Sequence, residues 1–140
     1  MDHKSLLWLG LAVLTAGCLG GADAKKVDDA QQNFFKEKAA RAYSQMFVEA
    51  APELQKSTTS DQFVATMQAF DDAFGQCQPP KKKLDIHTNA DSNGFVTSQG
   101  FTQDCERATV DETLTIILRN GLAQVQGFEY HGTPKSSATG

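Results

Sequence analysis

Residues that could hold a metal ion or carry redox chemistry are few and scattered. The 140 residues include three cysteines and three histidines, and no two cysteines have the C-x-x-C spacing of redox or zinc motifs. His87 and His131 each stand without a third ligand at a suitable spacing along the chain. We therefore expect neither a metal site nor a bound cofactor.

Positive charge is also scarce. The sequence has 13 Lys and Arg residues against 17 Asp and Glu residues, which gives a formal net charge of -4. Lys81-Lys82-Lys83 is the one basic run. Proteins that bind nucleic acid usually carry a basic face and an excess of positive charge, so we expect no nucleic-acid partner.

The sequence lacks the motifs of nucleophilic and phosphate-binding enzymes. It contains no G-x-S-x-G motif and no glycine-rich phosphate loop. What it does contain is 40% hydrophobic residues in 140 positions, which is enough to build the core of one domain. We therefore expect a single globular domain.

An apolar run near the N-terminus is typical of an export signal. Lys4 precedes the run Leu6–Leu14, which has the length of a signal-peptide core and is too short to span a bilayer. Small residues follow it. We expect an exported protein of the periplasm or cell envelope.

Two processing sites compete in the residues after this run. Ala22-Asp23-Ala24 fits an A-x-A cleavage site, which predicts a signal peptide over residues 1–24. Leu14–Cys18 resembles the lipobox of bacterial lipoproteins, which predicts removal of residues 1–17 and lipidation of Cys18. Residues 18–26 would then form a tether, and the lipid anchor at Cys18 would be the chain's contact with the membrane.

Cys77 and Cys105 remain after either cleavage. An even number of cysteines in an exported protein favours a disulfide. A free redox or metal-binding pair is the alternative, although it lacks C-x-x-C spacing and neighbouring histidines. We predict a disulfide between these two residues.

The first half of the mature chain has the pattern of two helices. Apolar residues recur every three or four positions from Val27 to Ala50, which predicts one long amphipathic helix that ends at Ala51-Pro52. One further helical turn can form over Glu53–Ser57. A capping box at Thr59–Gln62 starts the second helix, and Gly75 is its expected C-cap.

The second half has the alternating pattern of strands. Lys83–Thr88 predicts a strand, and Asn89–Gly94 predicts a turn. The poor alternation of Phe95–Phe101 suggests an edge or bent strand with a bulge at Gly100. Asn120-Gly121 sits between alternating runs and predicts a hairpin over Thr109–Tyr130, with another bulge expected at Gly127. The domain should therefore span residues 27–131, followed by a flexible tail over residues 132–140.

Several of these segments together resemble the NTF2-like (cystatin-like α+β) superfamily. They are the A-P-E-L break after the first helix, the F-G end of the second, and the strands V-D-E-T-L-T-I-I-L-R-N-G and V-Q-G-F-E-Y. More narrowly, the chain is similar to small exported bacterial domains of unknown function over roughly Asp28–Tyr130. The resemblance implies an α+β fold in which a bent antiparallel sheet of three to four strands wraps two N-terminal helices as a cone. It also implies an interior that is either packed or hollow enough to hold a ligand.

Two classes of function fit this description. The first is a non-catalytic envelope domain that binds a protein or a small amphiphile, for example an immunity or inhibitor protein, and that can form a homodimer. The second is a small enzyme that uses the cone for proton transfer or elimination. Its weak catalytic candidates are Tyr43 and Glu112, which shares strand parity with Leu114 and Ile116. A cone filled by side chains argues against the enzyme, and the expected filling residues are Phe34, Phe63, Phe70, Leu114 and Phe128.

Overall fold

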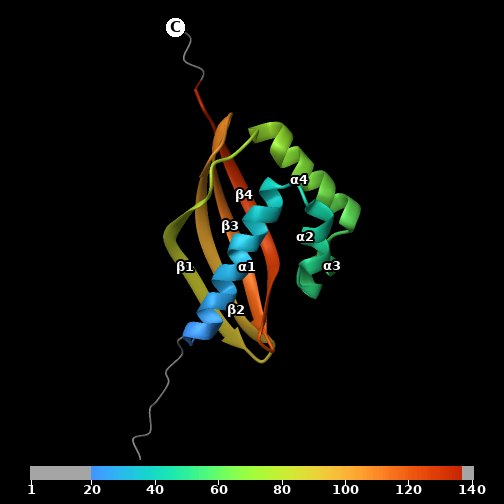
Figure 1. The fold of residues 1–140 in the computed structure, drawn as a ribbon, viewed down its shortest axis with the longest axis vertical. Coiled ribbons are helices and arrows are strands. Elements are labelled where there is room, and N and C mark those ends of the chain that lie inside the picture. The colour runs from blue at the N-terminus through green and yellow to red at the C-terminus, as the bar shows by residue number, and fades with distance from the viewer. Residues whose placement is uncertain (1–19, 137–140) are drawn as a thin grey trace, which may run out of the picture.

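A computed structural model describes residues 20–136 of the chain (Figure 1). Four helices come first and four strands follow, so the predicted α+β class is confirmed. The helices are α1 Gly21–Ala39, α2 Tyr43–Glu49, α3 Pro52–Ser57 and α4 Ser60–Phe74. The strands are β1 Lys81–Asp91, β2 Gly94–Asp104, β3 Ala108–Arg119 and β4 Leu122–Pro134. Cys18 and the apolar run of the expected signal peptide lie outside the described residues.

The four strands form one antiparallel sheet in the order β1-β2-β3-β4. Helix α1 crosses one face of this sheet, and α2, α3 and α4 stand beside it on the β4 side (Figure 1). At the junction of α2 and α3, the Ala51 N–H donates to the Val125 carbonyl of β4 at 2.8 Å. Within residues 20–136, no helix is long and apolar enough to cross a membrane.

The single long helix predicted from Val27 to Ala50 is wrong, because the chain breaks after Ala39. Arg41 adopts a left-handed conformation with φ 57°. The Arg41 N–H donates to the Lys38 carbonyl at 3.1 Å, and the Ala42 N–H donates to the Glu37 carbonyl at 2.9 Å. These two bonds form a Schellman motif, here without the usual glycine, so that α2 starts in a new direction. Helix α1 also begins at Gly21, six residues before the predicted start of the domain at Val27.

The predictions for α3 and α4 are confirmed. Pro52 occupies the first turn of α3, where its missing N–H costs no helical bond. Thr59 and Gln62 form the predicted reciprocal capping box at the start of α4. Gly75 ends α4 with φ 76°, a value that glycine adopts without steric cost.

Of the two alternatives predicted for Phe95–Phe101, an edge strand or a bent strand, the edge strand is wrong. Strand β2 pairs with both β1 and β3, and its weak alternation arises because its inward positions include Gln99 and Gln103, which are buried with hydrogen-bond partners. The bulge predicted at Gly100 lies in β1 instead, where Lys83–Asp85 stand opposite Gly100. A side chain at Gly100 would collide with the Asp85 carboxylate.

Strand β1 is longer than the predicted Lys83–Thr88, because it runs from Lys81 to Asp91 and leaves a turn of two residues before β2. The Asp91 carboxylate accepts a hydrogen bond from the Asn93 N–H at 2.7 Å. This side-chain bond closes the turn locally, so that positions 89–91 stay in the ladder.

The hairpin of β3 and β4 turns at Asn120-Gly121 as predicted. Both residues have positive φ, 52° and 75°, as this two-residue turn requires. The ladder shifts register between Thr115 and Ile116, which leaves Gln126 as an extra residue beside the predicted bulge position Gly127. The flexible tail predicted after residue 131 starts too early, because β4 pairs with β3 as far as Pro134.

Aromatic side chains fill the space between α1, α4 and the sheet. Phe34, Phe63, Phe70 and Leu114 are buried, and Phe128 packs against the core as a partly buried residue. The Phe34 and Phe128 ring centroids lie 4.9 Å apart, and those of Phe35 and Phe101 lie 4.8 Å apart. The interior beneath α1 is therefore packed with side chains.

Candidate functional site

Glu112 is the one carboxylate buried in the interior among residues 20–136. Its position in β3 points to the α1 side of the sheet together with Leu114 and Ile116, both fully buried. This is the parity predicted from the alternating pattern. Only 2% of Glu112 is exposed, so its charge requires a partner.

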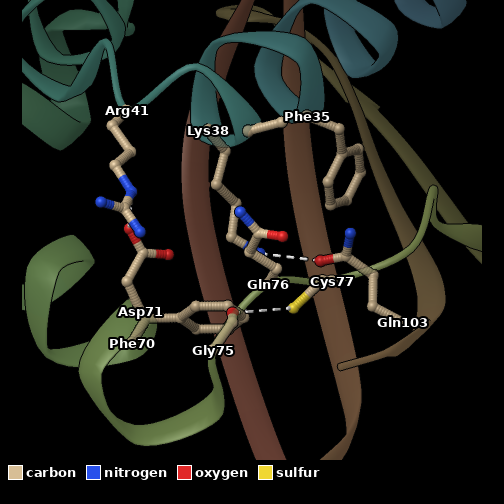
Figure 2. A pocket seen from close by; sticks show the side chains of 10 residues that line it. Phe35, Lys38, Arg41, Phe70, Asp71, Gly75, Gln76, Cys77 and Gln103 are labelled. Atoms are coloured by element: carbon tan, nitrogen blue, oxygen red, sulfur yellow. Dashed lines mark hydrogen bonds and ion pairs between the residues drawn. The ribbon is translucent and has the colours of Figure 1, made fainter. Parts of the chain in front are cut away.

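The partner is Lys38, near the C-terminal end of α1. Its Nζ lies 2.6 Å from Glu112 Oε1 and donates to Gln103 Oε1 of β2 at 2.8 Å. The same Nζ lies 3.6 Å from the centre of the Phe70 ring of α4. Figure 2 shows Lys38 reaching past Phe35 toward Gln103. Two strands and two helices therefore meet at one ammonium group.

Burial governs the electrostatics of this pair. Loss of water raises the pKa of the Glu112 carboxyl, and the neighbouring Lys38 opposes that shift in part. Loss of water likewise lowers the pKa of Lys38, again opposed by Glu112. Glu112 Oε2 has no hydrogen-bond partner in the described structure. The pair is thus held together against a large desolvation cost.

A second polar group lies where α1 ends. The Tyr43 hydroxyl donates to Asp71 Oδ2, and Arg41 Nε lies 3.3 Å from the same oxygen. Burial raises the pKa of Asp71, and the charges of Arg41 and Lys38 oppose the rise. Tyr43 and Arg41 cover Asp71 in part, which leaves its side chain 20% exposed. Tyr43 and Glu112 do not contact each other in this arrangement and instead belong to separate polar groups.

A small cavity opens above Lys38. Its volume is about 200 Å³, and its polar lining consists of Lys38, Arg41, Asp71, Gln76 and Gln103 (Figure 2). Ligand sites usually have volumes of about 300–1,000 Å³. The cavity is therefore below the usual size for a substrate, although it gives small molecules a path to the Lys38 side chain.

A larger cleft lies next to this cavity, and the two share Phe35, Ala39, Cys77 and Gln103 in their linings. It has a volume of about 510 Å³ and separates α1 from the segment that joins α4 to β1. The sulfurs of Cys77 and Cys105 lie at disulfide-bonding distance, as predicted, and they tie this segment to the end of β2. The Gln78 N–H donates to the Asp104 carbonyl at 2.7 Å. The cleft therefore has one helical wall and one wall fixed by a covalent bond.

Strand β1, next to this cleft, is exposed along its whole length. Leu84 is fully exposed and Ile86 is more than half exposed. The other edge of the sheet, β4, receives the Ala51 hydrogen bond described above. β1 is therefore the open edge, and its lysines and its bulge are features that discourage indiscriminate pairing.

The remaining titratable candidates do not converge on either site. His87 and His131 are exposed on different strands, and the described residues contain no group of three His, Cys, Asp or Glu residues arranged to hold a metal ion. Lys38 and Gln103 were missed by the sequence reasoning. A usable signal was present, because Lys38 and Gln31 occupy positions of the buried stripe of α1 with Val27, Phe34 and Phe35.

Two features of the chain thus stand out, the buried Lys38–Glu112 pair and the apolar cleft beside it. Each is built from residues that are distant in the sequence and that the fold brings together. Both features are interpreted from this chain's own residues, because no protein-family model and no curated protein matches the sequence.

Proposed function

We propose that this chain is an exported, non-catalytic binding domain of the cell envelope. The observation that carries the proposal is that the interior beneath α1 is filled, with Glu112 already engaged by Lys38, whereas an apolar cleft of about 510 Å³ remains open at the surface. A catalytic carboxylate needs access to its substrate, and a binding site needs open apolar area. The distribution of buried and open surface favours binding.

An NTF2-like architecture is part of this proposal. Helices followed by an antiparallel sheet, with α1 lying across one face, support it. The apolar run Leu6–Leu14 supports export, and Cys18 supplies a site for a lipid anchor. On this proposal the domain works at the envelope surface, where an anchored binding protein meets its ligand.

The ligand classes that fit are another envelope protein and a small amphiphile. An immunity or inhibitor role is one form of the first class, since an acidic chain of net charge -4 suits a basic target. A protein partner or a second copy of this chain would use the open edge at β1, by adding a strand to the sheet. A small amphiphile would use the cleft.

The test uses the chain expressed from its full sequence and purified as bait. Envelope extract is passed over the bait, and eluates are analysed by native mass spectrometry for protein partners and for small ligands. The matched variants are Ala39→Trp, which adds bulk to the cleft, and Ala40→Trp, the next residue, which does not line it. A small ligand that is retained by the native chain and by Ala40→Trp but lost in Ala39→Trp is the expected result for the cleft, whereas a protein partner on β1 should be retained by all three. Recovery of neither a stoichiometric protein nor a bound ligand in any condition would refute the binding role.

One observation favours the alternative, a small enzyme. Both members of the Lys38–Glu112 pair have shifted pKa values, and Lys38 lines a cavity; perturbed ionisable groups next to a cavity are typical of active sites. Hydrogen exchange at the carbon next to a carbonyl, followed by NMR in D2O over a panel of small ketones, tests this function. Exchange that Glu112→Gln abolishes while the fold is retained would establish catalysis, whereas exchange equal to the buffer rate would exclude it for these substrates.

A further inference from the structure

The cleft between α1 and residues 77–82 has a predominantly apolar lining. Phe35 and Ala39 line it from α1, Pro79 and Pro80 line it from the opposite segment, and Phe101 lines it from β2. Phe35 and Phe101 are themselves buried and pack edge to face, so this wall is held in place by the core. An apolar surface of this kind gains free energy when it is removed from water.

The charged residues among those that line the cleft are both lysines. Lys36 comes from α1 and Lys82 from β1. Lys82 bonds Asp28 at 2.5 Å, but both side chains of that pair are about half exposed, so the bond is weak and open to competition. Lys36 is exposed and has no carboxylate within salt-bridge distance among residues 20–136. The charged side chains that line the cleft are therefore both cationic, one of them paired with Asp28, on a chain whose net charge is -4.

A polar atom in the cleft wall also lacks a partner. Gln31 lines the cleft and is only 3% exposed, and its Oε1 has no hydrogen-bond partner in the described structure. A buried amide oxygen without a partner carries a desolvation cost that only a hydrogen-bond donor can relieve. A carboxylate is not such a donor, so the contribution that Gln31 can make to an oxygen-bearing head group is donation from its amide N–H groups.

We infer that this cleft binds a free single-chain carboxylate amphiphile, a fatty acid, with the chain against the apolar walls and the carboxylate toward Lys36 and Lys82. This inference rests on the proposed binding function and names its ligand class. The cleft volume of about 510 Å³ falls in the usual range for small-molecule sites. A peptide fits less well, because its backbone N–H and C=O groups would need partners that these apolar walls do not provide.

Isothermal titration of the full chain with octanoate, laurate and dodecylamine, all below their micelle concentrations, tests the inference. We expect one laurate per chain and a gain of about fourfold in affinity for each methylene that the cleft accommodates. Dodecylamine has the same chain length as laurate with the opposite charge, and it should bind about tenfold more weakly. Equal binding of laurate and dodecylamine, or no dependence on chain length, would overturn the inference.

Variants locate the site and test the charge. The double reversal Lys36→Glu/Lys82→Glu should weaken laurate binding about tenfold or more and narrow the gap to dodecylamine, because like charges repel at the mouth. Lys56→Glu changes an exposed lysine of α3 that does not line the cleft, so it should leave the affinity unchanged. Ala39→Trp should abolish laurate binding and Ala40→Trp should preserve it, with circular dichroism confirming that each variant is folded. Laurate binding that survives both the double reversal and Ala39→Trp would refute this site.

A third measurement separates a free fatty acid from a lipid surface. Flotation with phosphatidylglycerol vesicles should leave the unlipidated chain, made as Cys18→Ser, in the unbound fraction. Vesicle binding without laurate binding would overturn the inference in favour of a headgroup surface. If no laurate binds while a different small ligand from the envelope extract is still lost in Ala39→Trp, the ligand class is wrong and the proposed binding function stands.

Discussion

Lys38 and Lys82 each hold a carboxylate at nearly the same distance in very different surroundings. Lys38 Nζ lies 2.6 Å from Glu112 with the side chains 6% and 0% exposed, whereas Lys82 Nζ lies 2.5 Å from Asp28 with the side chains 52% and 50% exposed. Water screens the second pair, whereas the first pair is almost completely removed from water. The two pairs therefore differ in role although their distances are alike. Lys38–Glu112 is a fixed part of the interior, whereas Lys82 at the mouth of the cleft can exchange Asp28 for another anion.

The same contrast extends to the regions that hold the two pairs. Aromatic rings from α1, α4 and β4 surround Lys38, whereas every residue of β1 is exposed. Stability should therefore depend on the first region and binding on the second. Four measurements test this division.

Removal of a single carboxylate should separate the two pairs most clearly. Glu112→Ala leaves the Lys38 ammonium buried without its partner and should reduce the free energy of unfolding by about 3–5 kcal/mol. Asp28→Ala should change it by about 1 kcal/mol or less. Urea denaturation measures both values. The double variant Lys38→Met/Glu112→Leu should recover most of the loss, and a double variant as unstable as Glu112→Ala would show that the pair itself stabilises the fold.

The disulfide joins the two regions, and its removal should have the next largest effect. The bond spans a sequence separation of 28 residues, for which the chain-entropy estimate is about 3.5 kcal/mol. Thermal unfolding of Cys77→Ser/Cys105→Ser against the native chain measures the loss. Alkylation of the folded protein without reductant, followed by peptide mapping, should label neither Cys77 nor Cys105, and stoichiometric labelling of either would contradict the bond.

One substitution made in both regions tests the division directly. Leu114→Ala creates a cavity in the interior and should cost about 3 kcal/mol. Leu84→Ala alters a fully exposed side chain of β1 and should change the free energy of unfolding by about 0.5 kcal/mol or less. Urea midpoints of the two variants provide the comparison. A loss at Leu84 that depends on protein concentration would instead reveal a partner chain on β1.

The smallest effect should come from a surface pair that belongs to neither region. Arg119 bonds both oxygens of Glu53 at 2.6 and 3.0 Å and lowers the pKa of Glu53 to about 2. Because this pKa is lower in the folded state than the usual 4.5, the stabilisation is present above pH 4.5 and is lost as the pH falls toward 2. Melting temperatures of the native chain and Glu53→Gln should therefore converge between these values. Curves that stay parallel over this range would contradict the linkage.

Local signals explain which parts of the fold were predictable. The capping box at Thr59, the glycine at position 75 and the Asn120-Gly121 turn each fix a backbone conformation within a few residues, and each prediction was confirmed. The break at Arg41 has no such signal, because arginine takes a left-handed conformation there under tertiary constraint. The apolar residues keep their helical spacing past Ala39, where α1 ends. The spacing alone therefore predicted one helix in place of α1 and α2.

Of the buried pair, the sequence predicted the position of Glu112 but not that of Lys38. Strand parity placed Glu112 inside, since its neighbours Leu114 and Ile116 alternate with polar residues. Its partner lies 74 residues away, and no pattern within one sequence connects two such positions. The position of β2 was mispredicted for the same reason. The buried Gln103 is explained by its hydrogen bond from Lys38, which is distant in the sequence.

The disulfide has a consequence for how the molecule opens. The covalent loop from Cys77 to Cys105 contains the whole β1–β2 hairpin, so the most exposed strand is fastened at its base while its tip at Asp91 is free of packing. Amide protons of β1 should therefore exchange with solvent through small local openings, whereas those of β3 should exchange only when the whole domain unfolds. Reduction of the bond should speed exchange most at Gln78, Lys81 and Lys82, because this wall of the cleft would no longer be fastened to the end of β2.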